Sequence, residues 1–182
     1  MLDRTPITFK YNRDKTFQVA LWFLSRHGGV LHRLKLVKLL FLADRTHLAK
    51  YGRPISGGSY VAMKLGPVCS EFLDDLKKSS RRAVLPVRSE GHKVVARTAV
   101  DEDQLSESDI EVLREVNDRY GNLDRFALAD LTHKLKAWVR NYPNLTANTS
   151  RPLPCEDFFL DLPNDEMLEF VQENHQAWSG LA

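Results

Sequence analysis

The sequence predicts an α+β fold in which a helical bundle carries a small antiparallel β element. Two long segments near the N-terminus space their apolar residues at helical intervals, whereas residues 60–65 alternate with the period of a β-strand. A third observation is a pair of β-branched runs separated by a short polar turn at Gly91, which is typical of a hairpin. At 182 residues the chain is long enough for one domain with a substantial core.

The first two predicted elements are helices that end at glycine. Residues 14–27 form the first helix and precede Gly28 and Gly29. Residues 31–51 form the second, and Gly52 follows at the position where helix ends favour a left-handed residue. Apolar side chains occupy nearly all sides of the middle of this second helix, so we expect it at the centre of the bundle.

A strand, a turn and a third helix are predicted next. Residues 60–65 form the strand, with Lys64 in its interior. Gly66 can adopt backbone angles closed to other residues, and Pro67 suits the first position of a helix, where its missing N–H costs nothing. We therefore expect the helix to cover residues 67–78.

The rest of the chain is predicted as a hairpin followed by further helices. In order, the elements are a hairpin of residues 83–87 and 93–98, a helix over 108–120, a helix over 124–142, an extended connection over 143–163 and a last helix over 164–178. The first of these helices starts at a capping box that begins at Ser108, and four prolines mark the connection. We divide the chain into a helical domain, residues 1–142, and a C-terminal part, residues 143–182, that packs on the same domain.

The composition is that of an ordinary globular protein, and it argues against several classes of function. Charged residues make up 27% of the chain and the net charge is +2, so no global field favours nucleic acid or an anionic membrane. No apolar segment approaches the length of a membrane span, and no signal peptide is recognisable at the N-terminus. The two cysteines lack metal-ligand spacing, and we expect them to be reduced thiols of a cytoplasmic protein.

Asp44 is the most informative single residue, because it lies in the apolar arc of the second helix. On a helical wheel it falls between Val37 and Leu40, where an unpaired carboxylate would be costly. We expect backbone N–H groups or the ammonium of Lys64 to satisfy it. The alternative is an acid–base pair of Asp44 with His47, but no nucleophile or metal-ligand spacing accompanies that pair.

Four blocks of sequence carry a resemblance to a known family. They are residues 36–44 (LVKLLFLAD), residues 52–55 (GRPI), residues 60–68 (YVAMKLGPV) and the Leu-Thr-His triplet at 131–133 followed by Trp138. In this order and at this spacing they resemble the Panacea domain of SocA-like antitoxins. We expect a structural role for the residues that match the family's pattern, which are Lys38, Asp44, Gly66, Pro67, Thr132, His133 and Trp138.

The resemblance implies an antitoxin of a bacterial or phage toxin–antitoxin system, which neutralises a cognate toxin protein by direct binding. We accordingly expect no catalysis, no cofactor and no metal, and a cytoplasmic location without membrane contact. One relative in the family acts instead as an adaptor that delivers its toxin to a AAA+ protease. A protease adaptor is therefore the first alternative.

A DNA-binding autoregulator is the alternative from another class. Helices followed by a hairpin suggest a winged helix, in which the helix over residues 67–78 would read the bases. A recognition helix needs several basic or amide side chains on its exposed face, whereas Glu71, Asp74 and Asp75 make this one acidic. We therefore do not expect a nucleic-acid partner.

Thr132 and His133 admit a catalytic interpretation, because histidine is the commonest general base. Neither an orienting acid nor a nucleophile is signalled near them. We expect instead that their side chains form hydrogen bonds that hold a helix against the turn at Gly66 and Pro67.

We expect the toxin to dock across residues 52–75, a segment that helices fix at both ends. Preorganised contacts favour affinity, and acids at the end of this segment would complement the basic active site of a toxin that acts on nucleotides or RNA. The candidate partner-binding residues are Arg53, Tyr60, Lys64, Glu71, Asp74 and Asp75. The alternative is that this segment is scaffold, while the hairpin and the C-terminal helix select the partner.

Overall fold

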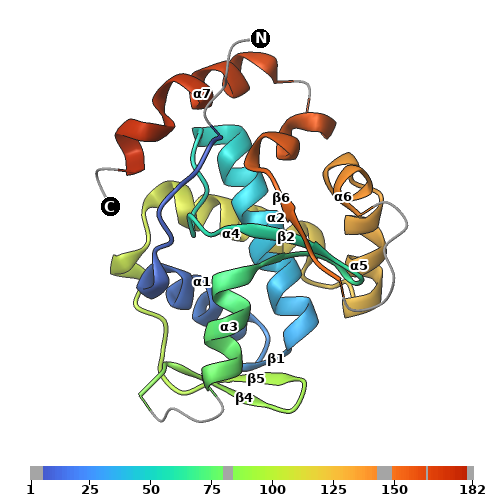
Figure 1. Ribbon diagram of the computed structural model, residues 1–182. Coiled ribbons are helices and arrows are strands. Elements are labelled where there is room, and N and C mark those ends of the chain that lie inside the picture. The colour runs from blue at the N-terminus through green and yellow to red at the C-terminus, as the bar shows by residue number, and fades with distance from the viewer. Residues whose placement is uncertain (1–5, 80–83, 143–148, 163, 180–182) are drawn as a thin grey trace.

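The computed structural model describes residues 6–79, 84–142, 149–162 and 164–179. Helix α2 (Arg33–Tyr51) runs through the middle of the molecule, and the other elements surround it (Figure 1). Every residue from Leu36 to Asp44 is buried, which covers all sides of the helix. The long apolar second helix is therefore central, as predicted, and Gly52 ends it with a left-handed φ of 72°.

The N-terminal part contains one helix and one short strand before α2. Helix α1 (Arg13–Arg26) is capped by the side chain of Asn12. The prediction was wrong at the start of the next helix, because strand β1 (Val30–His32) precedes α2. His32 caps α2 by accepting a hydrogen bond from the backbone N–H of Leu34 at 3.1 Å. The residues that suggested a first helical turn are therefore a strand and a cap.

Strand β1 is the edge of a three-stranded antiparallel sheet with the order β1-β5-β4. Strands β4 (Val87–Glu90) and β5 (Lys93–Ala96) form a hairpin, in which Gly91 has a φ of 59°. The predicted hairpin is confirmed, but its first strand begins at Val87 rather than at residue 83, which lies outside the described ranges.

A second three-stranded antiparallel sheet has the order β3-β2-β6. Strands β2 (Tyr60–Met63) and β3 (Gly66–Cys69) form a hairpin, and β6 (Arg151–Leu153) pairs with the other side of β2. The prediction of a helix from Pro67 was wrong, since Pro67 lies in β3 and helix α3 (Ser70–Ser79) begins only after that strand. Proline is tolerated there because β3 is an edge strand, which leaves one row of its backbone groups without a partner strand.

The elements that follow the β4–β5 hairpin in the chain are mainly helical. In order they are the 3-10 helix η1 (Glu102–Gln104) and the helices α4 (Glu107–Tyr120), α5 (Arg125–His133) and α6 (Lys136–Asn141). The capping box of α4 is formed by Ser106 and Asp109. The prediction that it begins at Ser108 was therefore wrong. The single helix predicted over residues 124–142 is broken, because Leu135 has extended backbone angles. The break separates α5 from α6.

The C-terminal part contains β6, the 3-10 helix η2 (Cys155–Asp161) and helix α7 (Asp165–Ser179). The connection predicted as extended therefore carries a strand and a 3-10 helix within its described residues. Phe158 of η2 packs edge-on against Phe41 and Tyr60, with ring centroids 5.3 Å apart in both pairs. This part of the chain thus contributes to the same hydrophobic core as α2. The result is an α+β fold dominated by helices, as predicted (Figure 1).

Candidate partner-binding surface

Asp44 is fully buried on α2 and receives four hydrogen bonds from the chain that follows the helix. Its Oδ1 accepts from the backbone N–H groups of Ile55 and Ser56, both at 2.9 Å. Its Oδ2 accepts from the Ser56 hydroxyl and, at 2.7 Å, from the Tyr60 hydroxyl. Burial raises the pKa of Asp44, and the hydrogen bonds from Ser56 and Tyr60 oppose that rise. The expected backbone donors are present, whereas Lys64 is not among the donors, because it lies exposed in the β2–β3 turn.

The loop between α2 and β2 also packs closely on the N-terminal segment. The carbonyl oxygen of Ser56 accepts from the backbone N–H of Asn12 at 2.8 Å. Gly57 has a φ of 68°, and a Cβ at this position would lie 2.2 Å from the carbonyl oxygen of Lys10. Only glycine fits there. The loop is therefore held by Asp44 on its inner side and by the N-terminal segment on its outer side.

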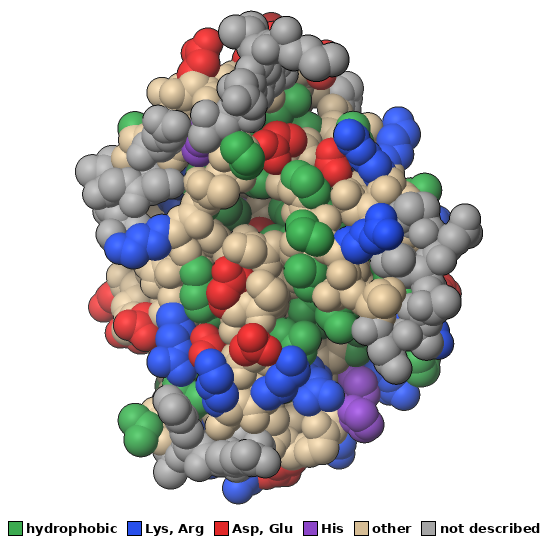
Figure 2. Space-filling model, viewed as in Figure 1, with side chains coloured by type: hydrophobic (Ala, Val, Ile, Leu, Met, Phe, Trp, Pro, Cys, Tyr) green, Lys and Arg blue, Asp and Glu red, His purple; other side chains and the backbone are tan. Residues whose placement is uncertain are grey.

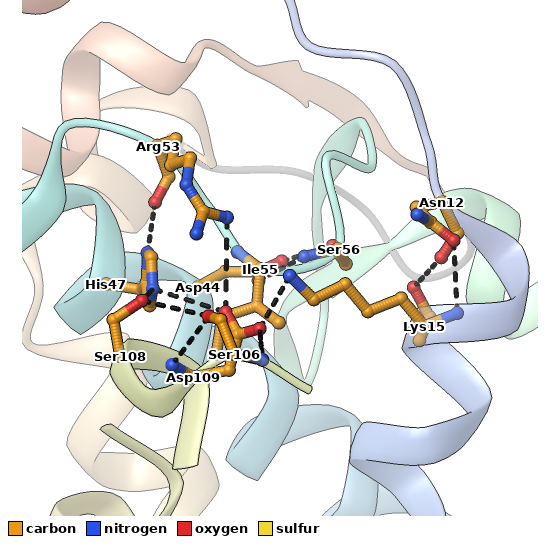
Figure 3. A network of polar contacts seen from close by, with 11 residues as sticks. Asn12, Lys15, Asp44, His47, Arg53, Ile55, Ser56, Ser106, Ser108 and Asp109 are labelled. Carbon is orange, nitrogen blue, oxygen red and sulfur yellow. Dashed lines mark hydrogen bonds and ion pairs between the residues drawn. The ribbon is translucent and has the colours of Figure 1, made fainter. Parts of the chain in front are cut away.

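A second polar cluster lies close to Asp44 and joins α1, α2 and α4 (Figure 3). Asp109 is buried and lies 2.6 Å from Lys15 Nζ and 3.2 Å from His47 Nε2. His47 Nδ1 lies 2.6 Å from the carbonyl oxygen of Arg53, whose guanidinium is 4.0 Å from Asp109. Burial would raise the pKa of Asp109, but hydrogen bonds from His47 and Lys15 outweigh it and hold that pKa well below its ordinary value. This cluster ties the residue after Gly52 to α4.

The cluster around His47 does not have the geometry of a nucleophilic relay. In such a relay the acid and the hydroxyl lie at opposite nitrogens of the imidazole. Here Asp109 and the Ser108 hydroxyl, at 3.0 Å, both face Nε2, and Nδ1 is engaged by a backbone carbonyl. The side chains of His47 and Asp109 are also fully buried. The pairing of His47 with Asp44 that the sequence suggested is replaced by contacts that position the loop.

Lys38, a fully buried lysine of α2, holds the β2–β3 hairpin. Its Nζ donates to the carbonyl oxygen of Pro67 at 2.8 Å, and burial lowers its pKa to about 7. Gly66 has a φ of 97°, and a Cβ there would lie 2.5 Å from Thr132 Oγ1 and 2.8 Å from Lys38 Nζ. Thr132 donates to the carbonyl oxygen of Ala129 at 2.9 Å, within its own helix. It therefore contacts the hairpin by close packing and not by the hydrogen bond that we expected.

The turn of the same hairpin is held from α5 and α6. Trp138 Nε1 donates to the carbonyl oxygen of Met63 at 2.9 Å. The Trp138 ring stacks on His133, with 4.2 Å between the ring centroids. Burial lowers the pKa of His133, and the positive charge of Lys38 lowers it further. The break between α5 and α6 thus places Trp138 against the turn.

Residues 52–68, here termed the anchored segment, run between two fixed points on α2. We call the first point the Asp44 anchor (Asp44, Ser56 and Tyr60) and the second the Lys38 anchor (Lys38, Gly66, Thr132 and Trp138). Of the candidate partner-binding residues on this segment, Lys64 is exposed and the Arg53 side chain is 35% exposed. Tyr60 is buried with its hydroxyl on Asp44, so it is not available to a partner in this conformation.

The acids of α3 do not form the exposed acidic face that we predicted. Asp75 is buried and paired with Arg13 at 3.1 Å. Glu71 is half-buried and accepts from the backbone N–H of Ser59 at 3.0 Å. Asp74 alone among the three acids is exposed. Two of the three carboxylates are therefore buried or half-buried in contacts within the molecule.

The described residues also allow two broader statements. Within residues 6–79, 84–142, 149–162 and 164–179, no group of three or more His, Cys, Asp or Glu side chains is placed to hold a metal ion. None of the helices described in those ranges is long and apolar enough to cross a membrane. Cys69 and Cys155 are free thiols, and burial raises the pKa of both.

Comparison with known proteins identifies the family. A family model described as "Antitoxin SocA-like, Panacea domain" matches residues 36–139. The matched range starts in α2 before Lys38 and ends in α6 after Trp138, so both anchors lie inside it. No curated protein and no solved structure matches the chain.

Proposed function

This chain belongs to the family of SocA-like antitoxins with a Panacea domain, and we propose that it neutralises a cognate toxin by binding to it directly. The setting that we propose is the cytoplasm of a bacterium, with a toxin encoded by a bacterial or phage-derived gene pair. In this proposal the chain has no catalytic role, because its effect on the toxin is steric.

The observation that supports this proposal is that hydrogen bonds hold the anchored segment at both of its ends. Four hydrogen bonds to Asp44 fix its start, and contacts of Lys38 and Trp138 with the hairpin fix its end. Loops that are already ordered lose little conformational entropy when a partner binds, so they support high affinity. A protein that must cover another protein's active site benefits from such a surface. The anchored segment is therefore our candidate for part of the toxin interface.

Coexpression with the product of the adjacent gene tests the proposal. We expect that product to arrest growth of a bacterial host when it is expressed alone, and this chain to restore growth. A tagged copy of the chain should retain the toxin in stoichiometric amount during purification. The level of the toxin, followed by immunoblot, should not fall in rescued cells, because direct neutralisation leaves the toxin intact whereas a protease adaptor would deplete it. Rescue without any complex between the two purified proteins would contradict the proposal.

A further inference from the structure

A groove of about 700 Å³ opens between the β2–β3 turn and the N-terminal ends of α2 and α5. Its apolar lining includes Leu34, Val37, Met63, Leu65, Leu73 and Phe126. Leu65 is 47% exposed and Phe126 is 57% exposed, although both are large apolar side chains. Exposed apolar side chains that gather in one concave site indicate a surface that another molecule covers.

Basic side chains surround this apolar floor. Among the described residues that line the groove, the charged ones are Arg33, Lys64, Lys77 and Arg125. His32 and His92 also line it and stack on each other, with ring centroids 5.6 Å apart. Figure 2 shows Lys and Arg side chains gathered across the lower part of the visible face, near the end of α3, with a histidine beside them. The whole chain carries a net charge of only +2, so this concentration of positive charge is local.

The acids closest to these residues in the chain are already engaged. Asp124 caps α5 by accepting from the backbone N–H groups of Phe126 and Ala127, at 2.7 and 2.9 Å. Asp74 lies 2.9 Å from Lys77, and the charge of Asp124 interacts with that of Arg125, so these two acids offset part of the four formal charges. The remaining cations of the groove face an apolar floor without a carboxylate among the described lining residues.

The pKa of His32 is consistent with a positive potential inside the groove. Burial lowers the pKa of His32, and the charges of Arg125, His92 and Arg33 lower it further. Cations that disfavour a proton on one ring act together on whatever enters the same space. The groove thus attracts an anionic group and repels a cationic one.

We propose that this groove receives a segment of the toxin that carries apolar side chains flanked by carboxylates. The proposal rests on the antitoxin function proposed above and specifies the chemistry of the partner's contact. The apolar side chains enter between Leu65 and Phe126, and the carboxylates pair with Arg33, Lys64 and Arg125 at the rim. Burial of apolar groups supplies most of the affinity, while complementary charge orients and speeds the encounter.

The apolar floor favours a protein segment over a nucleic acid, the other polyanion that a basic groove attracts. Single strands bind by stacking bases on exposed aromatic faces along a basic track. Besides the two histidines, Phe126 is the one aromatic ring among the described lining residues, so these residues provide no row of aromatic faces for successive bases. The rest of the apolar floor consists of Leu, Val and Met side chains, which match the side chains of a protein better than bases.

The Lys38 anchor makes one wall of the groove rigid. Lys64 and Leu65 form the β2–β3 turn, and the residues on either side of that turn are the ones held by Trp138 and Lys38. The wall therefore needs no ordering when a partner arrives, which favours affinity.

A binding experiment with a defined probe tests the groove independently of the toxin. The probe is a labelled synthetic peptide with leucines at helical spacing and glutamates elsewhere, and its matched control has lysines in place of the glutamates. By fluorescence anisotropy we expect the full chain to bind the acidic peptide at least about tenfold more tightly than the basic one. Leu65→Asp, Phe126→Ser and Arg125→Glu should each weaken binding of the acidic peptide by about tenfold or more.

Two surface variants outside the groove are the matched controls for these changes. Val139→Asp introduces a charge at a 54% exposed valine, and Arg114→Glu reverses an exposed charge on α4. Both should leave the affinity unchanged. Circular dichroism and thermal unfolding confirm that each variant is folded. Equal binding of the two peptides, no binding of either, or groove variants that bind as well as the controls would overturn the proposal.

A second set of experiments measures growth rescue and binding of the adjacent gene product and of nucleic acids by the same variants. Groove variants should lose rescue of growth and binding of that product, while the controls retain both. If the unaltered chain binds the acidic peptide but not the adjacent gene product, the proposed function fails for that pair while the groove stands. If groove variants keep the toxin and lose only binding of duplex DNA or single-stranded RNA, the groove is a nucleic-acid site and the proposal is overturned.

Discussion

Two buried charges on α2 hold the two ends of the anchored segment, and they are held in different ways. The carboxylate of Asp44 accepts four hydrogen bonds, two from backbone N–H groups and two from hydroxyls. The ammonium of Lys38, which lies nearer the N-terminus of α2 and about 9 Å away along the helix axis, donates to one backbone carbonyl. Hydrogen bonds from the protein thus replace the hydration of Asp44, whereas Lys38 has only one hydrogen bond to replace its hydration.

This difference separates a contact that stabilises the fold from one that costs stability. A buried charge is tolerated when hydrogen bonds replace its hydration, and it is destabilising when they do not. Burial shifts the pKa of both groups against the charged form, upward for Asp44 and downward to about 7 for Lys38, but only at Asp44 do hydrogen bonds oppose the shift. We therefore expect substitution of Asp44 to lower the free energy of unfolding more than substitution of Lys38. Substitutions of the residues that contact the β2–β3 hairpin should have effects of intermediate size.

The largest expected effect is that of Asp44→Ala. It leaves the backbone N–H groups of Ile55 and Ser56 and the hydroxyl of Tyr60 buried without an acceptor, so we expect a loss of about 3 kcal/mol in the free energy of unfolding. Urea unfolding measures this. Asp44→Asn keeps the volume and one acceptor, and it should cost clearly less. An alanine variant as stable as the natural chain would show that these hydrogen bonds do not hold the loop.

Gly66→Ala should destabilise the hairpin by about 2–3 kcal/mol, because it combines backbone strain with close contacts to Thr132 and Lys38. Gly91→Ala is the matched control. Gly91 also has a positive φ, of 59°, but nothing lies within 4 Å of a Cβ built there. Its cost should be limited to the strain, about 1–2 kcal/mol. Equal melting temperatures for the two variants would show that the close approach at Gly66 contributes nothing.

Trp138→Phe tests the hydrogen bond between Trp138 and the β2–β3 turn. The substitution keeps an aromatic ring beside His133 but removes the Nε1 donor to Met63, so we expect a loss of about 1 kcal/mol. Thermal unfolding measures the loss, and the affinity of the acidic peptide should fall in parallel, since the wall of the groove becomes less ordered. A stability equal to that of the natural chain would indicate that water replaces this hydrogen bond.

Lys38→Met should have the smallest effect, a change of less than about 1 kcal/mol at pH 8. At that pH the buried amine is mostly neutral, so an apolar side chain of similar length removes one hydrogen bond together with a buried polar group. The pH dependence sharpens the contrast. In the unfolded chain a lysine has a pKa of about 10.4, and in the folded chain Lys38 has a pKa of about 7.

Between these two values the unfolded state binds one more proton at Lys38 than the folded state. The free energy of unfolding therefore rises with pH from about 7 to about 10 in the natural chain relative to Lys38→Met. Below about pH 7 both states are protonated and the difference stops changing. Urea unfolding of both proteins at several pH values checks this, and a constant difference would show that Lys38 is not desolvated.

Much of the fold was predictable because its signals are local. The apolar residues of α2, the glycine after it and the hairpin around Gly91 each follow from a short stretch of sequence. The errors arose where one signal had two meanings. Gly66 followed by Pro67 is typical of a helix start, and it is also compatible with an edge strand. In the structure these residues form an edge strand because they pair with β2. Nothing local indicates that pairing.

The Asp44 anchor was predictable in part, whereas the cluster beside it was not. Burial of Asp44 follows from the helical wheel, and the backbone donors follow from the cost of an unpaired carboxylate. Lys64 was the alternative donor, because it was expected inside the strand, but the strand ends at Met63 and the chain turns at Lys64. Asp109 was missed as the partner of His47, since 62 positions separate them in the chain. The pattern Ser106-x-x-Asp109 was the local sign that a carboxylate would be fixed at the start of α4.

Hydrogen exchange of the free chain, and of the chain bound to the adjacent gene product, tests the central claim most directly. We expect the amides of Ile55 and Ser56 and those of the β2–β3 hairpin to exchange slowly before the partner is added, because both anchors are already formed. Binding should then slow exchange further around Leu65 and Phe126 while leaving the protection of the anchors unchanged. Fast exchange throughout residues 52–68 in the free chain, with protection that appears only on binding, would contradict the account.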